Sequence, residues 1–190
     1  EKGDVKLKNA LGPDTAYLRN NLRDSLLKDI NDNPQEKGTL HIYELSNIYI
    51  PRKDDLPNEK LVLAGIIKNG EYRLNKGIVE KLLDILQIEY TTRIEEGNGY
   101  LPNQRLEIVS NKVKIGEYGN LENGLYFYEF SIDSILAAKK IARKYKEINK
   151  YPPQVEDLTL VLPEKTYVGD VISEITHNSE LITFVELSDI

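Results

Sequence analysis

The uninterrupted apolar run LVLAGII at residues 61–67 is the feature that most constrains the fold of this chain. The run is much shorter than the roughly 20 apolar residues that a membrane-spanning helix requires. Its length is that of a strand, and a strand that is apolar at every position is buried on both faces. We therefore expect a central strand in a sheet whose two faces are covered, and no membrane association.

Two stretches with helical periodicity can provide the layers that cover such a sheet. An aliphatic residue recurs at every fourth position from Leu18 to Ile30, which predicts an amphipathic helix over residues 17–30. Apolar residues at helical spacing predict a second helix over residues 78–86, and the segment 75–77 leads into it.

Short strands are predicted for much of the remaining sequence up to residue 146. Asn111-Lys112 separates two strand-like segments, and because asparagine tolerates a positive φ, this pair predicts a β-hairpin. The polar segment 51–57 predicts a loop. The expected strands are residues 5–8, 39–50, 60–68, 90–94, 105–110, 113–118 and 125–130. Together these elements predict an α+β fold with an antiparallel sheet flanked by helices.

The segment 147–153 predicts a linker, because Pro152-Pro153 stiffens it and excludes a helix there. The residues after it follow a strand–helix–strand order, which is the first half of a split βαβ unit. Its elements are a strand at 157–162, a helix opened by Thr166 or by Gly169, and a strand at 181–187. The expected organisation is one domain over 1–146, the linker, and half of a second domain over 154–190.

The residue content excludes several kinds of catalytic and metal site. The chain has no cysteine, and its two histidines, His41 and His177, are far apart in the sequence, so neither a thiolate nor a histidine metal site is expected. Walker A, dinucleotide-binding and nucleophile-elbow motifs do not occur in the sequence. We therefore expect no catalytic, cofactor-binding or metal-binding residue. No signal peptide opens the sequence, which predicts a cytoplasmic protein.

Charge gives a weaker indication of the partner. The net charge of −6 argues against a free-standing protein that binds nucleic acid by displacing counterions, but not against a subunit whose partner provides the basic surface. Arg105, at the start of a strand, is expected to pair with a nearby carboxylate, and binding of an anion is the alternative.

One basic cluster stands out, on the outer face of a third helix predicted from Ser131 or Asp133 to Ala142 and beyond. A solvated helix face is the simpler interpretation, since cations are favoured near a helix C-terminus. RNA backbone or an acidic partner surface are the alternatives. The RNA-facing candidates are Lys139, Lys140, Arg143, Lys144 and Lys150.

Seven short motifs follow one another along nearly the whole chain in the order of a known family. They are YLRNNL (17–22), IYELS (42–46), LAGI (63–66), LNKG (74–77), IGEYG (115–119), YEFSID (128–133) and KYP (150–152). In this order they resemble the catalytic-like module of the bacterial phenylalanyl-tRNA synthetase β subunit, followed by the start of its ferredoxin-fold anticodon-binding domain. Glu156 departs from the pattern, because the family favours arginine there.

The resemblance implies a core similar in fold to a class II synthetase but without the arginines that hold ATP. Catalysis would belong to the partner α subunit, which would bind ATP, Mg²⁺ and phenylalanine, in an enzyme with two α and two β subunits that acts on tRNA-Phe. The resemblance also implies that the helix at 17–30 supports the subunit interface. The interface candidates are Tyr17, Leu18, Arg19, Leu22, Arg23 and Leu26.

Two alternatives remain open at this point. The chain could be a free-standing ligand- or protein-binding module that reuses the synthetase-like fold, which predicts a closed surface with one well-formed pocket. It could also be a small enzyme, which would need a cleft containing carboxylates with shifted pKa values.

Overall fold

The computed structural model describes residues 4–13, 16–34, 37–53, 55–142, 145, 147 and 150–188. The chain divides into two compact units, Glu1–Lys144 and Tyr145–Ile190. The first unit carries a large sheet with helices against it. The second carries the helix α4 (Val168–His177) among its described residues.

A six-stranded antiparallel sheet lies at the centre of the first unit, in the strand order β3-β4-β8-β7-β6-β5. In that order the strands are β3 (Leu40–Arg52), β4 (Asp55–Lys68), β8 (Tyr126–Ser131), β7 (Val113–Leu121), β6 (Tyr100–Ser110) and β5 (Thr91–Ile94). A separate small sheet pairs β1 (Val5–Lys6) with β2 (Tyr17–Leu18). The predicted α+β fold with an antiparallel sheet flanked by helices is confirmed.

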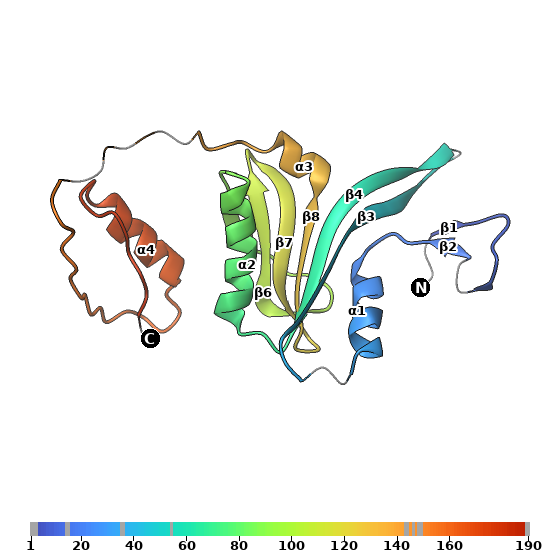
Figure 1. Cartoon of the computed structure of the whole chain (residues 1–190), viewed down its shortest axis with the longest axis horizontal. Coiled ribbons are helices and arrows are strands. Elements are labelled where there is room, and N and C mark those ends of the chain that lie inside the picture. The colour runs from blue at the N-terminus through green and yellow to red at the C-terminus, as the bar shows by residue number, and fades with distance from the viewer. Residues whose placement is uncertain are drawn as a thin grey trace. The chain divides into compact units, whose positions relative to one another are not determined.

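The apolar run lies in β4 and contributes to two cores, one on each face of the sheet. Ala64 and Ile66 pack in the core beneath α1 (Arg23–Asp32), whereas Ile67 packs in the core beneath α2 (Tyr72–Ile85). Figure 1 shows these two helices on either side of the sheet. Alternate side chains of a strand point to opposite faces, so both faces of β4 are buried although it lies beside the edge strand β3.

The helix predicted over residues 17–30 is wrong at its N-terminal end. Tyr17 and Leu18 form β2 and pair with β1, and the helix begins only at Arg23. Asn21 explains the later start, because its side-chain Oδ1 accepts a hydrogen bond from the backbone N–H of Asp24 at 3.0 Å. This bond satisfies one of the N–H groups that have no partner inside the helix.

Three other boundaries differ from the prediction. Most described residues of the segment 51–57 belong to strands and not to a loop, since β3 and β4 extend into it and pair as far as Arg52 with Asp55. The second helix begins at Tyr72, so Gly77 lies inside it. The third helix, α3 (Ile132–Ala137), is capped by the Ser131 side chain as expected, but it ends before Lys139.

The early end of α3 has a structural cause. Ala138 adopts an extended backbone with a φ of −65° and a ψ of 150°. The Lys139 carbonyl then accepts a hydrogen bond from the Glu89 N–H at 2.9 Å, and Ile141 donates to the Gln87 carbonyl. The backbone after α3 therefore bonds to the segment that follows α2 instead of continuing a helix. The basic residues described after Ala137 do not lie on a helix face.

The second unit contains the predicted helix but not the predicted strands. Among the described residues of 157–162 and 181–187, none belongs to a strand. An extended segment becomes a strand only when a neighbouring segment pairs with its backbone groups. Helix α4 also has no buried residue, so it does not pack on a sheet among the described residues. The half ferredoxin-like domain over 154–190 therefore stays a prediction. No helix in the described part of the chain is long and apolar enough to cross a membrane.

Two glycines make a matched test of the sheet packing. The Tyr128 ring lies directly over Gly65 and is held there by a 2.8 Å hydrogen bond between its hydroxyl and His41 Nε2. We expect Gly65→Ala to lower the free energy of unfolding by about 1–3 kcal/mol, because the added methyl group meets a ring that is packed in the core and hydrogen-bonded to His41.

Gly77→Ala is the control, measured by urea unfolding in parallel. Gly77 lies in α2 with open space around it, so alanine should raise the free energy of unfolding by up to about 1 kcal/mol through helix propensity. Equal effects of the two substitutions would contradict the packing described for Gly65.

Candidate functional site

Three glutamates form a row across neighbouring strands of the sheet. Glu107 on β6 is opposite Glu117 on β7, and Glu117 is opposite Glu129 on β8. Residues that are directly opposite on neighbouring strands point to the same face of the sheet. For these glutamates it is the face on which α1 packs. Phe127 belongs to the α1 core, and Glu129, two positions later on the same strand, points to the same side. Like charges directly opposite one another are destabilising, so the row requires cations.

Arginine and lysine side chains provide those cations from the same part of the sheet. Arg105 Nη2 lies 2.6 Å from Glu117 Oε2 and 3.1 Å from Glu107 Oε1. Arg93 Nη2 lies 2.7 Å from Glu107 Oε2, and Lys114 reaches both Glu107 and Glu117. Glu107 and Glu117 are thus each shared between cations, whereas Glu129 lies beyond this cluster.

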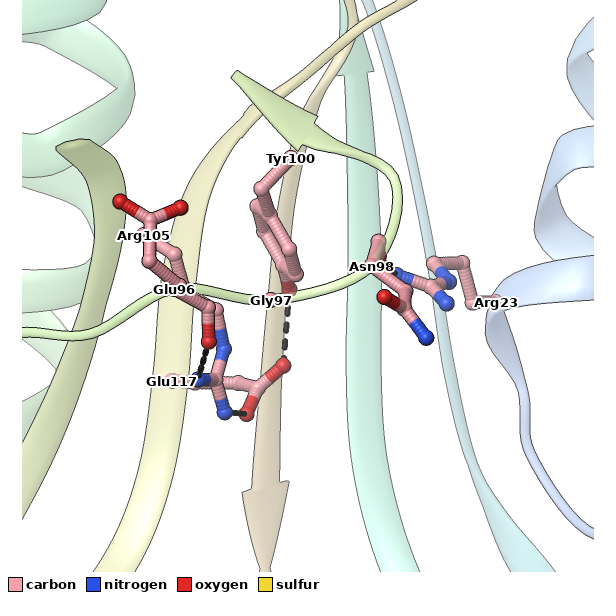
Figure 2. Close-up of a pocket in the computed structure, with 7 residues that line it drawn as sticks. All are labelled: Arg23, Glu96, Gly97, Asn98, Tyr100, Arg105 and Glu117. Carbon is pink, nitrogen blue, oxygen red and sulfur yellow. Dashed lines mark hydrogen bonds and ion pairs between the residues drawn. The ribbon is translucent and has the colours of Figure 1, made fainter. Parts of the chain in front are cut away.

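Tyr100 adds a neutral donor to the cluster. Its hydroxyl donates a hydrogen bond to Glu117 Oε1 at 2.9 Å (Figure 2). The guanidinium carbons of Arg105 and Arg23 lie 5.8 Å and 5.7 Å from the centre of its ring. Both oxygens of Glu117 therefore accept hydrogen bonds, and two cations lie against the buried aromatic ring.

An open hollow of about 410 Å³ lies next to this cluster, and Tyr100, Arg105 and Glu117 contribute to its lining. Figure 2 shows its lining residues, which come from the start of α1, the loop before β6, and strands β6 and β7. They are Arg23, Glu96, Gly97, Asn98, Tyr100, Arg105 and Glu117.

The loop before β6 is tied to the hollow by its own backbone carbonyls. Arg105 Nη1 donates to the Glu96 carbonyl at 2.8 Å, and Arg23 Nη1 donates to the Asn98 carbonyl at 3.1 Å. Gly97 permits the close approach, because a Cβ at this position would collide with the Arg105 side chain. Arg105 is therefore held by two glutamates and by the loop, all from this chain.

Glu117 and Glu129 have opposite pKa shifts. Burial alone would raise the pKa of Glu117, but hydrogen bonds from Arg105, Lys114 and Tyr100 outweigh it and lower the pKa to about 2. Burial raises the pKa of Glu129, and the neighbouring Glu117 carboxylate raises it further. Glu117 is thus a weak proton acceptor at neutral pH, which does not suit a general base.

The described residues contain no group of three or more His, Asp or Glu side chains arranged to hold a metal ion. The arrangement of cations and carboxylates can fix strands and a loop in place, and it presents one further cation, Arg23, at the edge of the hollow. The prediction that Arg105 pairs with a carboxylate is confirmed.

The residues predicted for a subunit interface have different surroundings. Leu22 and Leu26 are fully buried in the α1 core, whereas Tyr17 is exposed on β2. Arg19 makes an ion pair with Glu44 at 2.7 Å. Leu18 is half-buried, and Arg23 borders the hollow. The interface role of these residues stays a prediction.

The predicted RNA-facing residues are only partly described. Lys139 makes an ion pair with Glu89 at 2.7 Å, and Lys140 Nζ donates to the Ile135 carbonyl at 3.4 Å. Lys150 is exposed in the second unit. Arg143 and Lys144 lie outside the described residues, so an RNA-facing role for this set stays a prediction.

Sequence reasoning missed Tyr100, Glu107 and Glu117 as members of one cluster. A tight hairpin at Asn111-Lys112 would place Leu106 opposite Glu117. The structure instead contains a register shift next to Ile115 on β7, which brings Glu107 opposite Glu117. No pattern in the sequence shows this shift.

Removing the Tyr100 hydroxyl should weaken the fold. Tyr100→Phe loses a hydrogen bond to a charged carboxylate, so we expect the free energy of unfolding to fall by about 1.5–3 kcal/mol. Tyr126→Phe is the matched control, because the buried Tyr126 hydroxyl has no hydrogen-bond partner among the described residues. It should leave stability unchanged or raise it. The check is urea unfolding at neutral pH, and a loss of equal size in both variants would contradict the role of Tyr100.

Acid should reveal the opposite shifts of Glu117 and Glu129. The folded pKa of Glu117 is lowered from 4.5 to about 2, so its stabilisation is complete above pH 4.5 and is lost as the pH falls toward 2. Glu117→Gln should cost about 2 kcal/mol at neutral pH, with a smaller difference from the unmodified chain in acid.

Glu129→Gln should show the opposite sign. The raised pKa of Glu129 means that its charge is costly in the folded state, so Gln should stabilise at neutral pH. This gain should shrink as the pH falls through the folded pKa of Glu129. Urea unfolding at several pH values measures both variants, and a Glu117→Gln effect that does not change with pH would contradict the ion-pair cluster.

Comparison with known proteins places the chain in a family. Residues 1–132 match the family model described as "Phenylalanyl tRNA synthetase beta chain CLM domain". A phenylalanine–tRNA ligase β subunit from Fusobacterium nucleatum is 31% identical over 98% of this chain and 27% of its own length. One from Clostridium tetani is 26% identical over 100% of this chain and 26% of its own length.

The chain thus spans about a quarter of the length of these curated relatives. Among solved structures, a pyrrolysyl-tRNA synthetase from Desulfitobacterium hafniense matches 62% of this chain and 48% of its own, with 13% identity and a TM-score of 0.48. Because the family model matches residues 1–132 of the 190, the chain belongs to the phenylalanyl-tRNA synthetase β-chain family.

Proposed function

We propose that this chain acts as a non-catalytic scaffold within a phenylalanine–tRNA ligase β subunit. In this role it supports assembly with the α subunit, in an enzyme with two copies of each subunit, and the attachment of phenylalanine to tRNA-Phe in the cytoplasm. ATP, Mg²⁺ and phenylalanine would bind to the α subunit. The family match supports the ligase, and the polar cluster supports the scaffold role.

The observation that best supports the scaffold role is that Arg105 binds acceptors of this chain itself. Its guanidinium is held by Glu117, Glu107 and the Glu96 carbonyl. A phosphate-binding arginine must offer free N–H groups to its ligand, whereas these donors are directed at the chain's own acceptors. A nucleotide in the hollow would therefore have to displace partly buried ion pairs.

Surface residues near the start of α1 suit a contact with the α subunit. Tyr17 is exposed on β2. Arg19 is fixed by Glu44 and by the Ser46 hydroxyl, so it is already ordered before a partner binds. Ordered tyrosine and arginine side chains are common in the energetic centres of protein interfaces.

Co-expression with the phenylalanine–tRNA ligase α subunit of the same organism tests the proposal. We expect a complex in size-exclusion chromatography with light scattering. In calorimetry the isolated chain should bind neither ATP nor phenylalanine. Tyr17→Glu should weaken the complex about tenfold or more, because it places a charge in the interface.

Tyr43→Glu is the control, because Tyr43 is an exposed tyrosine on β3. It precedes Glu44 by one position, so its side chain points to the opposite face of the strand from the partner of Arg19. This variant should leave the complex intact. Binding of ATP by the isolated chain would overturn the non-catalytic role. Failure of the unmodified chain to bind the α subunit would overturn the assembly role.

A further inference from the structure

Helix α2 has a second apolar face in addition to the one that packs on the sheet. Val79 and Leu83 are fully buried in the core, as expected for the inner face. On the outer side, Leu74 and Ile85 are 60% and 61% exposed. Exposed aliphatic residues in line on one helix commonly mark an interaction site.

An open groove of about 510 Å³ runs along this outer side. Its lining residues are Arg73, Leu74, Gly77, Ile78, Lys81, Leu82 and Ile85. Within this set, residues 74, 77, 78 and 81 have the i, i+3, i+4, i+7 spacing that forms a hole for one side chain of a facing helix. Residues 78, 81, 82 and 85 form the next hole in the same way.

Gly77 deepens the first of these two holes. A Cβ at Gly77 would have no atom within 4 Å, so the space in front of the glycine is open. Small residues allow two helices to approach each other closely.

Two cations lie along the groove and restrict the partner further. No carboxylate lies within ion-pair distance of the Arg73 guanidinium among the described residues. Lys81 pairs with Asp84 at 3.1 Å, but both side chains are largely exposed, so a partner carboxylate can compete for the lysine.

We propose that the outer face of α2 is a docking groove for an amphipathic helix of a partner protein, with an apolar seam bordered by carboxylates. Its aliphatic side chains enter the two holes, and its carboxylates meet Arg73 and Lys81. This surface differs from the α1 region considered for the subunit interface, and it stands independently of the proposed function.

Two synthetic helical peptides of about 20 residues serve as probes. Both carry leucines at heptad spacing, one with glutamates bordering the seam and the other with lysines in those places. Fluorescence anisotropy at low salt measures their binding to the full chain. We expect the glutamate peptide to bind at least about tenfold more tightly than the lysine peptide.

Variants of the chain locate the binding and test the charges. Leu74→Asp combined with Ile85→Asp should abolish binding of the glutamate peptide. Leu136→Asp on α3, at a leucine that is 73% exposed, should not change it. Arg73→Glu with Lys81→Glu should reverse the preference between the peptides. All these positions are at the surface, and circular dichroism with thermal unfolding confirms that each variant is folded.

Three results would overturn the proposal. The first is equal binding of both peptides to the unmodified chain, which would show that apolar contacts alone bind the peptides and that Arg73 and Lys81 do not select carboxylates. The second is glutamate-peptide binding that survives Leu74→Asp with Ile85→Asp. The third is a dimer in light scattering that these two substitutions dissociate, because the groove would then receive a second copy of the chain.

Discussion

The row Glu107–Glu117–Glu129 is the constraint on which the α1 side of the sheet depends. Three carboxylates directly opposite one another on adjacent strands repel, and the cations beside Glu107 and Glu117 offset that repulsion. Arg105 and Lys114 each contact both Glu107 and Glu117, and Arg105 also holds the loop before β6. One guanidinium thus couples strand pairing to loop position.

The same ion pairs limit the ability of this face of the sheet to bind a ligand. Removing one partner of a buried ion pair leaves an unpaired charge, which is more costly than keeping both. The ion pairs around Arg105 therefore make the hollow rigid and difficult to adapt to a ligand. Helix α2 on the other face is different, because Arg73 on its outer side has no ion-pair partner within the described part of the chain. On the first unit, the charged groups beside the hollow thus pair with one another, whereas the outer side of α2 exposes apolar side chains.

Sequence patterns predicted the sheet and most of its strands because burial on two faces leaves a clear apolar signal, as at residues 61–67. They overextended the first helix, because Leu18 falls in phase with Leu22 and Leu26 although it lies in a strand. Of the candidate site, the pairing of Arg105 was predictable from its type and place. Its partners were not, because they depend on a register shift that leaves no periodic signal.

That register shift has an evolutionary consequence. Alternation along a strand means that losing the extra residue near Ile115 would place Leu106 opposite Glu117 and move Glu107 out of the cluster. We therefore expect insertions and deletions to be rare in the β6–β7 hairpin during divergence of the family.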